Sequence, residues 1–350
     1  MMKTPVVWVR IIILAAGLYM LNQVTVIYLP VIVAIIAAFV LNPMVNGLTR
    51  ISFGMRRYHL PRGVSILLVF LLTILLLTIV TAFVLVPFIS EFNNFVIDLP
   101  KLINRIKNLT MLIERQANAA QVSDNIRLLF EDGLSGAASY GIGLLRNGIN
   151  AVLNFATQVI ELVVVPVLTY YFLKDWQSLK EAVVALFPRN TQTRAISIID
   201  EMAVVVSNYI RGQVFISALM GLLVFTGMYF LGVDYPIVLG IMATLTETIP
   251  IIGPIIGAIP AILLAYLAAP LLAIKVAAFY IILHQFENHI VVPNIMGHTI
   301  DLHPVLVIIS LLIGGQLYGI AGMILAVPVA ALLKVILRHL WYLDEDNKDG

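Results

Sequence analysis

The sequence predicts an all-α polytopic membrane protein, and three observations lead to this fold class. Hydrophobic residues make up 61% of the 350 residues, whereas charged residues make up only 11%. The mean hydropathy is +1.01, and a soluble domain carries about 25% charged residues. Long uncharged stretches separate short clusters of charged residues, which is the pattern of helices that cross a bilayer.

The composition also excludes several classes of chemistry. The chain has no Cys, so disulfides, thiolate nucleophiles and iron–sulfur clusters are excluded. A net charge of +2 gives no basic surface for nucleic acid. We therefore expect no cofactor, no bound metal and no nucleic acid. The expected partners are membrane lipid, a small transported solute or cation, and a second copy of the chain in a homo-oligomer.

The first 90 residues predict three membrane spans. Ile11 to Thr49 is 39 residues without a charge, which as a helix is roughly 58 Å long, about twice the hydrocarbon core. We expect two crossings here, with the turn between Asn22 and Pro30. Gly63 to Ser90 adds a third uncharged span. The Arg50–Arg62 loop holds four Arg and no acid, so the positive-inside rule places this loop and the N-terminus in the cytoplasm.

The middle of the chain alternates between amphipathic and apolar segments. Residues 91–148 carry six acids and six bases, with apolar residues at helical spacing, so we expect amphipathic extramembrane helices. Together with a fourth span, a cytoplasmic amphipathic segment and a C-terminal core, the chain divides into six predicted regions: 1–90 (three spans), 91–148 (extramembrane helices), 149–173 (fourth span), 174–208 (cytoplasmic helices), 209–337 (core with broken helices) and 338–350 (acidic cytoplasmic tail).

Two stretches of the C-terminal region predict broken helices, which brings the total to about eight hydrophobic segments. Tyr235 to Ala269 is too long for one span and contains a central break at Pro250, Gly253, Pro254, Gly257 and Pro260. Proline removes a backbone donor and clashes with the preceding turn, so a re-entrant hairpin of two half-helices is expected. Leu302 to Leu333 repeats the pattern around Gly314 and Gly315. In transporters such breaks build substrate or ion sites.

Ionisable residues inside these segments are the candidate site. A charge at the bilayer centre costs at least about 2.5–3.5 kcal/mol, and Glu247 immediately precedes the first break. We expect Glu247 to carry the ion or proton, or else to cap backbone donors at the break. On a helix, His284, Glu287 and Asn288 would share one face as a polar pathway lining.

Two further acids are weaker candidates. Glu161 lies within the fourth predicted span, and Asp301 lies in the polar connection GHTIDLHP. Glu161 serves equally well as a structural hydrogen-bond partner. Asp301 either gates an entrance or belongs to a capped loop. His284 and His289 are five residues apart, which does not match the i, i+4 spacing of a zinc-binding helix.

Several motifs in fixed order resemble the autoinducer-2 exporter family of predicted permeases. They are YYFLKD (170–175), LFP (186–188), NYIRGQ (208–213), LGVDYPIVLG (231–240), ETIPIIGPIIGAIPA (247–261) and the long stretch from QFENH (285–289) to AALLK (330–334). The resemblance covers roughly 160–337. It carries over to Arg211, Gly212, Gln213, Glu247, Pro250, Gly253, Pro254, Gly257, Pro260, Asn288, Pro293, Gly297, Pro304, Gly314, Gly315, Gly319, Gly322 and Pro328.

The resemblance implies a multi-pass protein of the bacterial inner membrane. Members of the family are associated with export of autoinducer-2 and others with Na⁺(Li⁺)/H⁺ antiport. Asp234 and Ile251 depart from the family pattern, which often has Pro and an aromatic residue there. We therefore expect a transporter and no enzyme. The alternatives are a membrane scaffold that does not transport and, more remotely, an intramembrane hydrolase.

Overall fold

The computed structural model describes residues 28–50, 52–53, 58–98, 100–101, 105, 143, 163–297 and 302–341. The chain divides into two compact units, one of residues 1–72 and 154–189 and one of residues 73–153 and 190–350. The division falls inside a long helix that begins at Arg62. Within the described residues the structure is almost entirely helical, which confirms the predicted all-α fold class.

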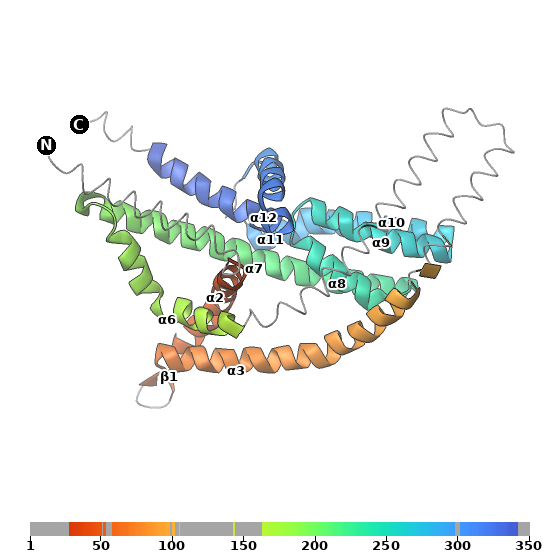
Figure 1. Ribbon diagram of the computed structural model, residues 1–350, viewed down its shortest axis with the longest axis horizontal. Helices are drawn as coiled ribbons and strands as arrows, with labels where there is room; N and C mark the ends of the chain where they lie inside the picture. The colour runs from red at the N-terminus through yellow and green to blue at the C-terminus, as the bar shows by residue number, and fades with distance from the viewer. Residues whose placement is uncertain are drawn as a thin grey trace. The chain divides into compact units, whose positions relative to one another are not determined.

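The first unit packs two helices with the start of a third. Its elements are α2 (Tyr28–Arg50), a two-residue hairpin of β1 (Ser52–Phe53) and β2 (Tyr58–His59), the first part of α3 (Arg62–Val80), and α6 (Val164–Val184). Figure 1 shows these elements. Arg62 joins the three helices, because its Nε donates to the Leu173 carbonyl at 2.7 Å and its two Nη atoms reach Asn46 and Asn42. From the sequence, Arg62 was interpreted only as one of the basic residues that place the Arg50–Arg62 loop in the cytoplasm.

The second unit contains the remaining described elements. They are the rest of α3, the π-helical turn η2 (Thr81–Leu85), a helix over residues 86–98, the 3₁₀ turn η4 (Arg189–Thr191), α7 (Gln192–Leu231), α8 (Pro236–Glu247), α9 (Ile252–Ala268), α10 (Pro270–Phe286), η5 (Glu287–Val291), α11 (Val292–Met296) and α12 (Pro304–Trp341). α8 packs along α7, and α9 packs against both α8 and α10 (Figure 1). Their shared core is centred on Ile216, Met220 and Leu264.

Five helical stretches in the described part of the chain are long and apolar enough to cross a membrane by length and composition, although the last of them is broken at Gly319. They are Pro30–Arg50, Arg62–Asp98, Arg189–Leu231, Pro270–Met296 and Pro304–His339. α8 and α9 are apolar but shorter, and they meet at the break predicted from the sequence. The chain is thus a multi-pass membrane protein. The extramembrane helices expected over 91–148 lie mostly outside the described residues.

α7 is longer than the sequence suggested. It is 40 residues long, which is about 60 Å and twice the hydrocarbon thickness. The boundary predicted between 208 and 209 therefore falls within one uninterrupted helix. Its N-terminal half carries charged side chains such as Arg194 and Glu201, and Glu201 pairs with Arg338 of α12.

The second predicted break is also present. α12 departs from helical geometry at Tyr318 and Gly319, where Gly319 has φ +59°. A Cβ on Gly314 would overlap the Gly322 carbonyl oxygen, and the reverse overlap holds as well. Eight residues of straight helix would separate these two glycines by about 12 Å. The chain therefore reverses direction at Gly319, and the two halves of α12 come into backbone contact at Gly314 and Gly322.

The N-terminus of α8 is capped by side chains from another helix. The Glu91 carboxylate accepts a hydrogen bond from the Val238 N–H at 3.0 Å, although no local side chain caps α8. Two turns after Glu91 on the same helix, Asp98 accepts a hydrogen bond from the Tyr235 hydroxyl at 2.8 Å. Desolvation, then the hydrogen bond to Asp98, raises the pKa of Tyr235 to about 12, so this hydroxyl stays a donor at neutral pH.

Replacing Glu91 by Ala is expected to destabilise α8. The substitution leaves the first N–H groups of the helix without an acceptor, and loss of a helix cap costs about 0.5–2 kcal/mol. Denaturant unfolding in detergent micelles would measure the loss. Glu91→Gln keeps one acceptor oxygen and is the matched control, so an equal loss for Gln and Ala would contradict the capping role.

Candidate functional site

The site is built around the turn that joins α8 to α9. α8 ends at Glu247 and α9 begins at Ile252, with only four residues between them. Ile251 has φ +68° and ψ −50°, and the Ile252 N–H donates to the Pro250 carbonyl at 2.7 Å. This is a three-residue γ-turn with positive φ, a rare and strained geometry, above all for a β-branched residue. The chain therefore reverses sharply immediately after Glu247.

Two of the predicted glycines allow the half-helices to close on each other. A Cβ on Gly253 would overlap the Thr246 carbonyl oxygen, and a Cβ on Gly257 would lie 2.8 Å from the Thr246 hydroxyl oxygen. Both glycines are helical, so close approach rather than unusual φ explains them. The result is that the last turn of α8, with Thr246 and Glu247, is held directly against α9.

Gly253→Ala is expected to open the hairpin and displace Glu247. The added methyl group meets backbone atoms of Thr246, which cannot move aside as a flexible side chain could, and overpacking of this kind costs about 1–3 kcal/mol. Gly47→Ala is the matched control, since a Cβ there has no atom within 4 Å in the described structure and Ala favours a helix by about 0.5–1 kcal/mol. In thermal unfolding experiments in detergent, the melting temperature should fall for Gly253→Ala and rise slightly for Gly47→Ala.

Two buried carboxyl groups meet at this turn. Glu247 is 4% exposed and Glu287 is 6% exposed, and their side chains are close enough to interact electrostatically. Glu287 opens the π-helical turn η5, directly after α10. π-helical turns are rare in proteins, but those that do occur often lie at functional sites. Because two ionised carboxylates repel each other strongly in an apolar environment, their proximity favours a proton on one of them.

His284 and Gln213 complete the polar cluster around the pair. His284 Nδ1 lies 3.0 Å from Glu287 Oε2. Gln213 of α7 donates from Nε2 to the Glu247 backbone carbonyl at 2.6 Å, which is one of the carbonyls left without an intrahelical partner at the end of α8. A chain of ionisable groups thus runs from His284 through Glu287 to Glu247.

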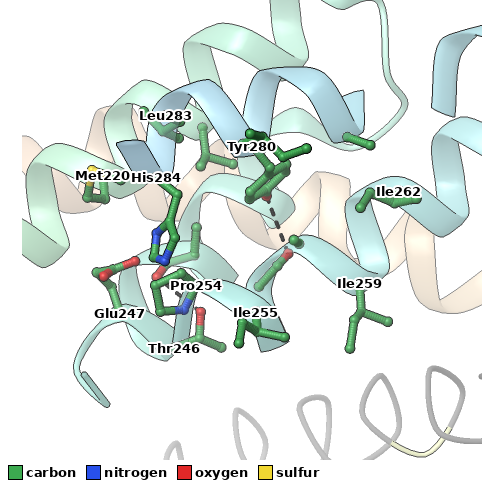
Figure 2. A pocket seen from close by; sticks show the side chains of 16 residues that line it. Met220, Thr246, Glu247, Pro254, Ile255, Ile259, Ile262, Tyr280, Leu283 and His284 are labelled. Carbon is green, nitrogen blue, oxygen red and sulfur yellow. Dashed lines mark hydrogen bonds between the residues drawn. The ribbon is translucent and has the colours of Figure 1, made fainter. Parts of the chain in front are cut away.

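A cavity of about 360 Å³ lies beside Glu247. Figure 2 shows the His284 ring and the Glu247 carboxyl group at one end and Ile259 and Ile262 toward the other. The complete lining is Met220, Val224, Ala243, Thr246, Glu247, Pro254, Ile255, Gly257, Ala258, Ile259, Ile262, Ala277, Tyr280, Ile281, Leu283 and His284. The cavity is therefore apolar except at Thr246, Glu247, Tyr280 and His284.

Two polar lining residues were not predicted from the sequence. Tyr280 donates its hydroxyl to the Gly257 carbonyl at 3.3 Å and so ties α10 to α9. It precedes His284 by one helical turn, so the i, i+4 relation would have placed it on the same face. Thr246 is adjacent to Glu247 and hydrogen-bonds to its own helix at Ala243. Nothing in the local sequence distinguishes it from other threonines.

The structure brings some predicted site residues together and leaves others apart. Glu247, Glu287 and His284 converge, and Pro254 and Gly257 line the cavity. Asn288 and His289, which follow the buried Glu287, are both exposed.

The remaining predicted residues lie elsewhere. Arg211 hydrogen-bonds to Ser207 on its own helix. Gly314 and Gly315 belong to the α12 reversal. Glu161 and Asp301 lie outside the described residues.

The cluster is suited to holding a proton or a small cation between carboxyl oxygens. Among the described residues, no group of three or more His, Cys, Asp or Glu side chains has the arrangement of a metal centre. The titratable groups nevertheless form one connected set in an apolar environment, where charge is costly. Protonation and cation binding at Glu247 and Glu287 would therefore compete.

These features define a multi-pass α-helical membrane protein of the permease class, with its polar site at a broken helix. A family model described as the AI-2E family transporter matches residues 9–341. The chain belongs to this transporter family, as its motifs in the C-terminal half indicated.

Individual relatives agree with this assignment. The chain is 28% identical to PerM of Escherichia coli K12, provisionally named a permease, over 95% of this chain and 92% of PerM. It is 27% identical to YueF of Bacillus subtilis, provisionally named a transport protein, over 89% of this chain and 84% of YueF. It is 34% identical to YrrI of Bacillus subtilis, which is named in the same way, over 56% of each chain.

Proposed function

We propose that this protein is a proton-coupled secondary transporter in which Glu247 and Glu287 form the proton-carrying pair. The observation that supports this proposal is the burial of these two neighbouring carboxyl groups, with His284 Nδ1 3.0 Å from Glu287 Oε2. A shared proton leaves the pair with one negative charge, and its loss leaves two. The second charge in an apolar core is unfavourable unless a cation replaces the proton.

This competition is the chemistry that an antiporter needs. A small cation such as Na⁺ or Li⁺ prefers oxygen ligands, which the carboxylates, the Thr246 hydroxyl and the carbonyls freed at the break can supply. His284 hydrogen-bonds to Glu287 and is half-exposed, so it is placed to exchange protons with the pair. We therefore propose exchange of Na⁺ or Li⁺ for H⁺ as the primary activity.

The cavity favours a second candidate cargo. Twelve of its sixteen lining residues are apolar, and ligand pockets of this kind bind solutes through apolar contacts and a few placed polar groups. A small neutral solute, such as the signal molecule autoinducer-2, could hydrogen-bond to Glu247 and His284 while the pair keeps its proton. Export would then use the proton gradient without binding a second cation.

The cellular setting belongs to the same proposal. The family and the basic Arg50–Arg62 loop support a bacterial inner-membrane location with the N-terminus in the cytoplasm. We propose that the C-terminal tail also lies in the cytoplasm. We also propose that the protein forms a homo-oligomer and that residues 209–337 form the transport core.

Cation-driven proton movement in everted membrane vesicles tests the antiport activity. Addition of Na⁺ or Li⁺ to energised vesicles should relieve quenching of a pH-sensitive dye. Glu247→Gln should abolish this response, because a neutral amide cannot release a proton and carries no negative charge to balance the cation. Glu181→Gln, at an exposed position of α6, is the matched control and should respond as the unmodified protein does.

A response that survives in Glu247→Gln would contradict the proposed proton carrier. If the folded, unmodified protein shows no response, antiport is excluded and the neutral solute becomes the leading cargo. Uptake of labelled autoinducer-2 into the same everted vesicles, driven by an imposed proton gradient, would then test that second cargo directly.

A further inference from the structure

α7 buries a row of three polar side chains, of which the proposed transport site uses only Gln213. Tyr209, Gln213 and Ser217 are 4%, 9% and 3% exposed, respectively. Their spacing of four residues places them on one face of the helix, one turn apart. Met220 and Val224 continue the same face and line the cavity beside Glu247. The row therefore leads along α7 toward the cavity, and Figure 2 shows Met220 at the same end as Glu247 and His284.

Two members of this row have buried polar atoms without a partner. Within the described part of the chain, the Tyr209 hydroxyl and the Ser217 hydroxyl accept and donate no hydrogen bond. Thr226 and Thr244, elsewhere on α7 and α8, instead donate to the carbonyl four residues earlier, as hydroxyl side chains in helices commonly do. An unsatisfied buried hydroxyl costs about 1–3 kcal/mol, so two of them in one row require an explanation.

Gln213 connects this row to the carboxyl pair. It lies between Tyr209 and Ser217, and its amide donates to the Glu247 carbonyl at 2.6 Å. From Tyr209 to Ser217 the helix advances about 12 Å. The charged N-terminal half of α7 adjoins Tyr209, whereas Ser217 adjoins the cavity lining. The row thus spans the distance between the polar end of α7 and the site at Glu247.

We propose that Tyr209, Gln213 and Ser217 line a passage of ordered water that conducts protons between Glu247 and the side of the membrane from which the N-terminal half of α7 projects. Buried water commonly satisfies polar groups of this kind and makes about three hydrogen bonds. The inference rests on the proposed function, because it supplies the proton pair with a route to one aqueous phase. The sequence predicts that this phase is the cytoplasm.

The absence of Cys from the chain makes the passage testable with single-cysteine variants. Ser217→Cys is nearly isosteric and places a thiol inside the passage. Ala218→Cys is the matched control, because Ala218 is exposed and lies at almost the same depth on a different face. Asn190→Cys, at an exposed position before α7, is the positive control for reagent access.

Silver ion is a suitable probe because it is small, charged and reactive with thiols. Everted vesicles would be treated with Ag⁺, quenched and denatured, and the remaining free thiol would be measured by a maleimide gel shift. A thiol in lipid stays protonated and unreactive, so Ser217→Cys should react about 100-fold faster than Ala218→Cys. In right-side-out vesicles Ser217→Cys should be protected from Ag⁺.

Equal rates for Ser217→Cys and Ala218→Cys, or reaction of Ser217→Cys only in right-side-out vesicles, would overturn the proposal. If Ser217→Cys fails to fold, Tyr209→Cys replaces it, with the same control and the same expectation. The labelling result is independent of transport. If Ser217→Cys reacts but the protein shows no antiport, the proposed antiport is rejected and the water passage is supported. If the protein shows antiport but Ser217→Cys is inert, the passage is rejected and the proposed antiport is supported.

Discussion

Two carboxyl groups that meet inside an apolar core set the constraint on which the rest of this structure depends. Glu247 and Glu287 are forty residues apart in the chain, and neither could remain buried as an isolated charge without a large cost. Sharing a proton lowers that cost, and it also makes the arrangement sensitive to any cation that can replace the proton. Burial and proposed function therefore have the same physical origin.

The surrounding backbone holds this pair in place. The γ-turn at Ile251 ends α8 directly after Glu247, and the missing side chains of Gly253 and Gly257 let α9 close on Thr246. A similar device joins α7 to α8, where a Cβ on Gly240 would lie 2.9 Å from the Gly221 carbonyl oxygen. Small residues at such crossings are typical of membrane helices, because close van der Waals packing substitutes for a hydrophobic driving force.

The sequence predicted the breaks and singled out Glu247 as a candidate because these signals are local. Proline and glycine alter the backbone at their own position, and an acid in an apolar stretch is costly wherever it lies. The sequence placed Glu287 in the polar lining of the same site, but the direct approach of its carboxyl group to Glu247 depends on how α8 and α10 pack and left no local signal. The cap from Glu91 to α8 left no signal in the sequence either.

α7 is a single helix whose two halves lie in different environments, one polar and one apolar. Its N-terminal half carries charges and its C-terminal half packs the apolar core, so the buried face must change from polar to apolar along its length. Tyr209, Gln213 and Ser217 make that change gradually, and Met220 completes it at the cavity. A purely structural helix would gain by replacing these buried hydroxyls with apolar groups, since their unpaired atoms cost stability. Their placement beside the carboxyl pair is therefore better explained by access of water to Glu247 than by packing.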